Sequence, residues 1–508
     1  MHLRHGQPLR GLAGAKKSPL FAGRFGRMFR SLPAATYGST DPNAAINVEN
    51  LNALAKAMIS EFDGPKDQHD DEESGIPALY TYFGQFVDHD LTFDPASTLQ
   101  AQNDPDALVD FRTPAFDLDN VYGRGPDDQP YMYEQPASGP VRRFLLGKTI
   151  TGGSPNATDL PRNAATPARA LIGDPRNDEN TIVSQLQGLF HRFHNRMVDD
   201  NPSLTFAQIQ ELVRFHYQYV ILNDFLPRIV RADILDALKT NRKYDAHKLK
   251  FYHWKNEPFM PVEFSVAAYR FGHSMIRPGY RLNDMVLLPI FPVPAQRLSE
   301  GLTGFREMIS VWGIDWGRFI DIDQRVYDGS DAENKKRLQF AYRIDTALVD
   351  PLAELPTAVA TDVPSLAARN LVRGLRMGLP SGQAVAKAMS VTPLTDDQIV
   401  IGQGIDNKPA PLPSITAISS SFADNCPLWT YVLAEAASKQ IGVKLPVVGD
   451  VTVTTPQLGD VGGRIVSEVF LGLMFGDANS LLTLSPDWYP PLKKDYKLKD
   501  FVLYALGK

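Results

Sequence analysis

A histidine between two aspartates ends one of the apolar helical patterns in this chain. Residues 76 to 91 have apolar side chains at helical spacing, with Gln85 inside the pattern and Asp88-His89-Asp90 near its end. Histidine suits proton transfer because its ordinary pKa, about 6.5, is close to neutrality. An apolar helix would place His89 at a cavity, where it could act as a base. The alternative for such a triplet is a solvated helix end.

An acidic loop follows, with oxygen-bearing groups at alternate positions. Thr113, Asp117 and Asp119 would point the same way in an extended loop, and the carbonyl of Ala115 could join them. Calcium takes roughly six to eight oxygen ligands and needs neither histidine nor cysteine. Asp90 could supply a further ligand from outside the loop. The sequence therefore indicates either a calcium site or a capped acidic turn.

A turn at residues 172 to 180 leads into the next helical pattern. Arg176 stands in this turn, in the run Gly-Asp-Pro-Arg-Asn-Asp-Glu. A fixed guanidinium beside a neutral histidine would stabilise negative charge that develops when a peroxide bond breaks. Asp178 and Glu179 suit a helix start because the helix dipole favours acids there, which is their ordinary interpretation.

A second histidine of interest lies in an otherwise apolar segment. His273 follows the run Ala-Ala-Tyr-Arg-Phe-Gly, where small residues and Gly272 would allow a close approach to the helix. Such a histidine is usually a hydrogen-bonded core residue. If it binds iron instead, its other ring nitrogen needs a partner that fixes the tautomer and tunes the metal.

The composition limits the class of protein. The chain has 508 residues, a net charge of -6 and a pI near 6.0, which is against a nucleic-acid binder. Cys426 is the single cysteine, so neither an intrachain disulfide nor a thiolate metal cluster can form. The absence of any apolar run of membrane-spanning length predicts a soluble protein. Residues 1–35 form a basic N-terminal arm without the apolar run of a secretory signal, so the localisation stays open.

Helical periodicity predominates along the rest of the chain. Prolines and glycines are scattered, and no linker or repeat divides residues 36–508, which predicts one large, mainly α domain with very little β structure. Valines and threonines at 451 to 454 form one of the few short strand patterns. The predicted helices cover about residues 76 to 91, 181 to 198, 204 to 224, 259 to 276, 363 to 376 and 461 to 475.

The motifs, taken in order, resemble those of the animal-type haem peroxidases in the peroxidase and cyclooxygenase superfamily. The similarity extends from about residue 20 to about residue 480, and chance is a poor explanation for six motifs in family order. They are Gln85 with Asp88-His89-Asp90, Thr113 with Asp117 and Asp119, Gly173 to Glu179, His194-Asn195-Arg196, Arg270 to His273, and Asn370 with Arg373; residues 461 to 466 also fit.

The resemblance implies a fold with haem b buried between a distal and a proximal helix. His89 would be the distal acid-base group, with Arg176 as its charge-stabilising partner. Gln85 would hydrogen-bond water or a small anion over the iron. His273 would be the proximal iron ligand, and Asn370 would accept its Nδ1 proton.

The resemblance also implies the remaining contacts of the haem and a calcium ion. Arg270 and Arg373 would pair with the haem propionates. Asp88 and Glu179 would form ester bonds to haem methyl groups, whereas Asn180 replaces the methionine that forms a third bond in the myeloperoxidase type. The calcium ligands would be Asp90, Thr113, Ala115, Asp117 and Asp119.

The implied activity is reduction of hydrogen peroxide with oxidation of a halide, thiocyanate or a small phenol. The chain lacks the disulfide framework of the secreted animal enzymes and so resembles a bacterial or minimal member. A competing function is that of a fatty-acid dioxygenase of the cyclooxygenase branch, whose signature the segment at residues 252 to 255 resembles, although Lys255 stands where the iron ligand should be. Two further possibilities are a catalytically weak haem-binding adhesion protein and a non-haem metallohydrolase. The metallohydrolase would use Asp88, His89 and Asp90, with His191 and His194 as additional ligands. The oligomeric state stays open.

Overall fold

Helices make up most of the regular structure. The computed structural model describes residues 25–67, 70–92, 112–255, 257–294, 300–327, 335–360, 362–403, 411–491 and 493–508. The α-helices are α1 Ala45–Ala57, α2 Leu79–Leu91, α3 Asp119–Tyr122, α4 Thr181–Asp200, α5 Phe206–Val220, α6 Leu226–Ile229, α7 Ala232–Asp236, α9 Leu366–Arg376, α10 Gly382–Ala388, α11 Ile415–Ile418, α12 Leu428–Ala437, α13 Gly462–Gly476, α14 Leu481–Leu484 and α15 Leu498–Ala505. The mainly α class predicted from the sequence is confirmed.

The strands are short and pair two by two. They are β1 Phe25–Gly26, β2 Glu73–Pro77, β3 Lys239–Thr240, β4 Lys243–Tyr244, β5 Met260–Pro261, β6 Gly279–Arg281, β7 Leu287–Pro289, β8 Phe340–Tyr342, β9 Gln440–Lys444 and β10 Thr452–Pro456. The β1 and β5 strands pair in parallel, and the pairs β2·β8, β3·β4, β6·β7 and β9·β10 are antiparallel. The predicted strand at 451 to 454 is found within β10.

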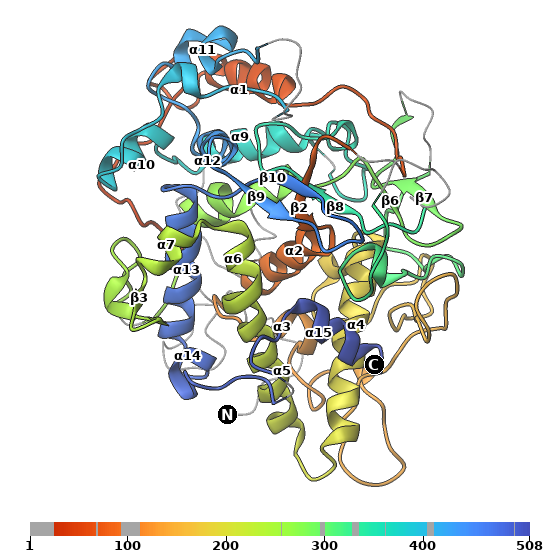
Figure 1. The fold of residues 1–508 in the computed structure, drawn as a ribbon. Helices are drawn as coiled ribbons and strands as arrows, with labels where there is room; N and C mark the ends of the chain where they lie inside the picture. Colours follow the sequence, from red (N-terminus) through yellow and green to blue (C-terminus); the bar gives the residue numbers. More distant parts are fainter. Residues whose placement is uncertain are drawn as a thin grey trace.

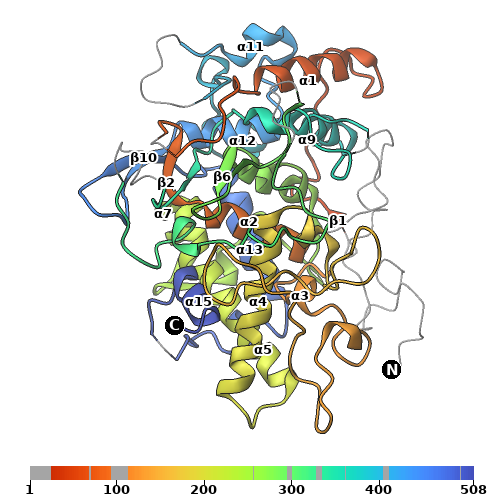
Figure 2. The ribbon, with the colours of Figure 1, turned by 90° about the vertical axis from the view of Figure 1, so that its right-hand side faces the viewer.

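Helix α2 lies in the middle of the molecule. Figures 1 and 2 both show it between a group of helices that includes α1, α9, α11 and α12 and a second group formed by α3, α4, α5 and α15. It contacts α4 on one side and the helical turns that lead to His273 on another. The fold thus places the two candidate histidines on neighbouring elements at its centre.

The interior position of α2 follows from its sequence. Phe83, Phe86 and Val87 are fully buried, and Phe86 stacks on Phe190 of α4 with ring centroids 4.2 Å apart. At Gly84, a Cβ atom would stand only 3.2 Å from the Phe225 ring, so a larger residue would push that contact apart. Close packing on these faces leaves the remaining face of α2 for polar groups.

The helix predicted at 259 to 276 is not one regular helix. The chain forms β5, then a π-helix at Glu263–Ala267 and a 3-10 helix at Ala268–His273. Ala267, with φ -131° and ψ -74°, leaves the helical region and separates the two turns. Residues three apart in a 3-10 helix lie on one face, so Arg270 and His273 point the same way.

The other predicted helices are found close to their expected bounds. They are α2, α4, α5 with a π-helical continuation at Ile221–Phe225, α9 and α13. Residues 1–24 of the predicted N-terminal arm lie outside the described residues, and Phe25 and Phe29 are buried against the core. Within the described ranges, no helix is both long and apolar enough to cross a membrane.

Candidate active site

A cavity lies beside α2, and both candidate histidines are in its wall. Its polar lining includes Gln85, Asp88 and His89 from α2, Glu179 from the turn before α4, and His273. Its apolar lining is extensive and consists of Phe225, Phe271, Met275, Ile276, Ile290, Phe291, Leu352, Leu355, Val359 and Leu366. A mostly apolar cavity with a few convergent polar groups is the usual form of a cofactor site.

On the distal side, Gln85, Asp88 and His89 share one face of α2 because they lie three and four residues apart. The His89 ring is buried, with Nδ1 2.7 Å from Oδ1 of Asn177. Burial lowers the pKa of His89 to about 3, and the Arg176 charge lowers it in the same direction. His89 is therefore a neutral imidazole at physiological pH, as an acceptor of a proton must be.

Arg176 adjoins the distal helix but is not among the described residues that line the cavity. Its Nη2 donates to the backbone carbonyls of His89, at 3.1 Å, and Thr92, at 2.6 Å. Its Nε and Nη2 also donate to the buried carboxylate of Asp174. The guanidinium thus holds the C-terminal end of α2 and brings a positive charge close to His89 on the backbone side of the helix rather than from the cavity.

Gln85 connects the distal helix to the turn before α4. Its Nε2 donates to Oε1 of Glu179, and its Oε1 accepts a hydrogen bond of 3.3 Å from Asn180. Asn180 is also the N-cap of α4, since its side chain accepts from the backbone amides of Ile182 and Val183. This capping gives a structural reason for asparagine at position 180.

Two carboxyl groups face the cavity beside these residues. Burial raises the pKa of Glu179 to about 7, although the Arg176 charge opposes the shift. Burial also raises the pKa of Asp88, against the charges of Arg176 and Arg270. Both acids lie where a ligand in the cavity would contact them.

On the proximal side, His273 ends its 3-10 helix beside α9. Nδ1 of His273 lies 2.8 Å from the amide nitrogen of Asn370. The amide oxygen of Asn370 faces away from the ring and accepts a 2.8 Å hydrogen bond from Arg270. The predicted acceptor role of Asn370 needs the opposite orientation of the amide. Burial lowers the pKa of His273 to about 3, with the Arg270 charge acting in the same direction.

The two predicted propionate partners differ in position. Arg270 lines the cavity and donates from Nε to the carbonyl of Ser265 at 2.9 Å. Burial lowers its pKa to about 10, against the Asp88 charge and with the positive charges of Arg373 and Arg369. Arg373 lies one turn after Asn370 on α9 and is half-buried, outside the set of described lining residues.

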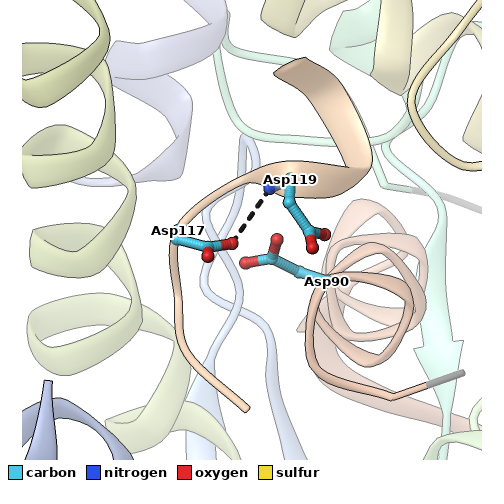
Figure 3. A group of neighbouring side chains, drawn as sticks. All are labelled: Asp90, Asp117 and Asp119. Carbon is cyan, nitrogen blue, oxygen red and sulfur yellow. Dashed lines mark hydrogen bonds between the residues drawn. The ribbon is translucent and has the colours of Figure 1, made fainter. Parts of the chain in front are cut away.

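Behind the cavity, three carboxylates meet at the far side of α2 (Figure 3). Asp90, Asp117 and Asp119 have oxygen atoms within 4.8 Å of one another. One oxygen of Asp90 is buried without a hydrogen-bond partner among the described residues, and the other accepts a 3.1 Å hydrogen bond from Tyr217. Burial and the charges of the other two aspartates raise the pKa of Asp90. A buried, unpaired carboxylate oxygen in an acidic cluster fits a hard cation.

The loop that forms this cluster curls rather than extends. Leu118 has a φ of 61°, a left-handed conformation, and Asp119 begins α3. The Thr113 hydroxyl donates to Asp117 at 2.6 Å and is 3.4 Å from Asp119. The expected side chains therefore converge, although not by alternation along an extended loop; they are Thr113, Asp117, Asp119 and Asp90. Ala115 lies within the same curled segment, where its backbone amide bonds to the carbonyl of Thr113.

Two competing interpretations of the sequence find no support in this geometry. Within the described ranges, the group of metal-ligating side chains that comes together holds three aspartates and no histidine, which is against the metallohydrolase. Tyr252, in the segment that resembles the dioxygenase signature, is fully buried, stacks on Phe259 and donates to its carbonyl at 2.8 Å, so it is a packing residue. The tyrosines that line the cavity are instead Tyr80, Tyr82 and Tyr269. Of these, Tyr269 donates its hydroxyl to the carbonyl of Gly84 at 3.2 Å.

Sequence reasoning missed Asn177, which binds the distal histidine. Its place directly after Arg176 in the turn at residues 172 to 180 was the available signal. Asn177 also donates a hydrogen bond to Gln187 on α4. No spacing rule could have linked Gln187 to His89. His194, which the metallohydrolase would have used, hydrogen-bonds Tyr122 and the carbonyl of Arg142.

Comparison with known proteins agrees with this geometry. The family model for animal haem peroxidase matches residues 100–398. Similar curated proteins include Peroxidasin of Drosophila melanogaster, 24% identical over 46% of this chain and 14% of that protein, and Thyroid peroxidase of Sus scrofa, 24% identical over 42% of this chain and 31% of that protein. The chain thus spans less than a third of either relative.

Solved structures share the fold across nearly the whole chain. Peroxidase A from Dictyostelium discoideum is 15% identical and superimposes with a TM-score of 0.59. The match covers 94% of this chain and 92% of the Peroxidase A chain. A fatty acid alpha-dioxygenase from Arabidopsis thaliana is 14% identical and superimposes with a TM-score of 0.54. The match covers 93% of this chain and 76% of the dioxygenase chain. The family model matches more than half of the residues, and the chain therefore belongs to the animal haem peroxidase family.

Proposed function

We propose that the protein is a haem-dependent peroxidase that reduces hydrogen peroxide and oxidises a halide, thiocyanate or a small aromatic donor. The observation that supports this most strongly is one cavity lined both by a neutral His89 and by His273, which has Asn370 behind it. One histidine would act on the substrate and the other would bind iron, which is the division of roles that peroxide reduction requires.

The cavity fits haem by its chemistry. Its aliphatic and aromatic wall suits a flat apolar ring system, and Arg270 offers a half-buried cation to a propionate. A propionate that takes the Arg270 guanidinium would release Oδ1 of Asn370, and the amide could then turn to accept the Nδ1 proton of His273. The Nε2 lone pair of His273 would be free for iron. Bound haem supplies the redox chemistry that reduces peroxide and takes electrons from the donor.

The distal residues would manage the protons. His89 would accept a proton from the bound peroxide at Nε2 and return it to the departing oxygen, because its Nδ1 is held by Asn177. Arg176 would stabilise the negative charge that develops on the peroxide oxygen through its electrostatic field, without lining the cavity itself. Gln85 would present its amide to a water or small anion in the cavity.

We further propose calcium as the ion between α2 and the acidic loop, held by Asp90, Thr113, Ala115, Asp117 and Asp119. Arg112 donates to Asp119 at 3.2 Å and so offsets part of the negative charge. The ion would fix the position of His89, which adjoins Asp90 in α2.

Asp88 and Glu179 are proposed to form ester bonds with haem methyl groups after exposure to peroxide. Both carboxyl groups line the cavity, and the raised pKa of Glu179 keeps part of it uncharged near neutrality. Denaturing mass spectrometry of protein treated with haem and peroxide should show an added haem mass, which is lost in the double variant Asp88→Asn and Glu179→Gln. Release of all haem from treated wild-type protein would contradict the proposal.

Tyr269 at the cavity wall favours one second candidate, a fatty-acid dioxygenase, because such enzymes need a tyrosine beside the haem. Arg270, rather than a tyrosine, stands three residues before His273, which favours the peroxidase. Haem-loaded protein should oxidise bromide, thiocyanate or guaiacol only when peroxide is added. Oxygen uptake with linoleate in the absence of peroxide, without donor oxidation, would reverse the assignment.

A further inference from the structure

A chain of hydrogen bonds runs from His89 into the core, away from the cavity. Nδ1 of His89 lies 2.7 Å from Oδ1 of Asn177, whose Nδ2 donates to Oε1 of Gln187 at 2.8 Å. Nε2 of Gln187 lies 2.9 Å from Nε2 of His191. All four side chains are buried, and Asn177 and Gln187 have no exposed surface.

The atom types in this chain fix where the protons are. An amide oxygen only accepts, so Nδ1 of His89 must donate the proton to Asn177. An amide nitrogen only donates, so Nε2 of His191 accepts from Gln187 and the His191 proton is on Nδ1. Turning either amide alone would place two donors or two acceptors face to face. The three hydrogen bonds therefore have one common direction and stabilise one another.

We propose that Asn177, Gln187 and His191 are positioning residues that hold His89 in its Nδ1–H tautomer, with the Nε2 lone pair directed to the cavity. This inference rests on the proposed peroxidase function, in which Nε2 is the atom that takes a proton from peroxide. Reversing the whole chain would move the proton of His89 to Nε2 and remove the base.

Stability alone does not account for the arrangement. Buried polar groups lower stability unless each is paired, and the Nδ1 atom of His191 is buried with no partner in the described structure. The His191 ring is held by stacking on Phe144, with centroids 4.4 Å apart and planes 5° apart. Nearby, His194 has partners at both ring nitrogens. The row of hydrogen bonds thus ends in an unpaired group, and its effect at the other end is to fix the donor direction at His89.

Two substitutions of Gln187 separate positioning from packing. Gln187→Leu removes the link, so Asn177 can turn and His89 can adopt either tautomer. Gln187→Glu keeps an acceptor for Asn177, and its second carboxylate oxygen accepts a hydrogen bond from His191, so His89 should be unchanged while the proton of His191 moves from Nδ1 to Nε2. Gln185→Leu is the matched control, because Gln185 is also a buried glutamine on α4 but hydrogen-bonds the backbone at Trp312 and Ile314 instead.

The experiment is ¹⁵N spectroscopy of the full chain without haem, labelled at histidine, with signals assigned by His89→Gln and His191→Gln. Protonated and bare ring nitrogens have well-separated ¹⁵N shifts. Wild-type protein and Gln185→Leu should show a protonated Nδ1 and a bare Nε2 for His89, Gln187→Leu should show averaged shifts, and Gln187→Glu should restore the His89 pattern. After haem loading, the rate constant with peroxide should fall about twofold or more in Gln187→Leu, in proportion to the remaining Nδ1–H population.

A protonated Nε2 on wild-type His89, or an unchanged His89 spectrum in Gln187→Leu, would overturn the proposal. The tautomer measurement needs neither haem nor turnover. Correct tautomers without any reaction with peroxide would therefore count against the proposed function and leave the positioning role standing.

Discussion

His89 is prepared for its role by burial and by one hydrogen bond. Burial keeps the imidazole neutral, with a pKa near 3, and Asn177 holds its Nδ1. An ordinary histidine would be largely protonated below about pH 6.5 and would lose its basicity there.

Replacing His89 tests the proton-transfer role. His89→Gln should lower the rate constant with hydrogen peroxide by about 100- to 10,000-fold, the usual contribution of a general acid-base group. Haem binding should be unaffected, because the proposed iron ligand is His273. Stopped-flow absorption measures the rate, and His194→Gln, at another buried histidine, should keep most of it.

The low pKa of His89 also predicts a flat pH profile. The neutral base is present above its folded pKa, so the peroxide rate constant should be nearly constant from about pH 5 to pH 8. A loss of half the rate near pH 6.5 would show instead that His89 titrates as an exposed histidine.

On the proximal side, Asn370 should tune the iron through His273. Asn370→Asp would provide a carboxylate acceptor for the Nδ1 proton, which makes the imidazole more basic and lowers the iron reduction potential. Spectroelectrochemistry of haem-loaded protein measures this shift, with Asn370→Ala as the control that removes the hydrogen bond. A potential that is the same in all three proteins would contradict the assigned contact.

Among the elements, α2 has the central place because its two polar faces belong to different sites. Gln85, Asp88 and His89 face the cavity, while Asp90 faces the acidic loop. An ion bound at the loop would therefore be coupled to the distal histidine through one helix.

Calcium removal tests this coupling. A chelator should lower the melting temperature, since a ligand at about 100 times its Kd contributes about 2.7 kcal/mol to the free energy of unfolding. Asp117→Asn should weaken the effect, whereas Asp127→Asn, at an acid outside the cluster, should not. Calorimetry with and without added calcium gives the comparison. Identical melting curves in chelator and in calcium would rule out a structural ion at this site.

Periodicity predicted the regular helices of the fold but not the irregular ones. The apolar spacing of α2, α4, α9 and α13 reflects one buried face, so their positions could be read from the sequence. The segment before His273 has similar spacing, yet it breaks at Ala267 into π and 3-10 turns. Tertiary contacts decide that break, and single-sequence patterns do not contain them.

Across the whole molecule, the motifs predicted which residues meet but not how they are oriented. His89 and His273 line the same cavity, and three of the predicted calcium ligands form one cluster. The Asn370 amide orientation and the backbone contacts of Arg176 depend on atoms far away in the sequence. The same holds for Gln187, whose contact with Asn177 arises from the packing of α4 against the turn Pro175–Asp178.

The measurement that tests the central claim most directly is the absorption spectrum of the haem-loaded protein before and after hydrogen peroxide. We predict a Soret band that shifts when peroxide is added and returns as bromide or guaiacol is consumed, and a changed resting spectrum in His273→Ala. A protein that remains colourless after haem is supplied, or a Soret band that peroxide leaves unchanged, would contradict the assignment of this cavity as a haem peroxidase site.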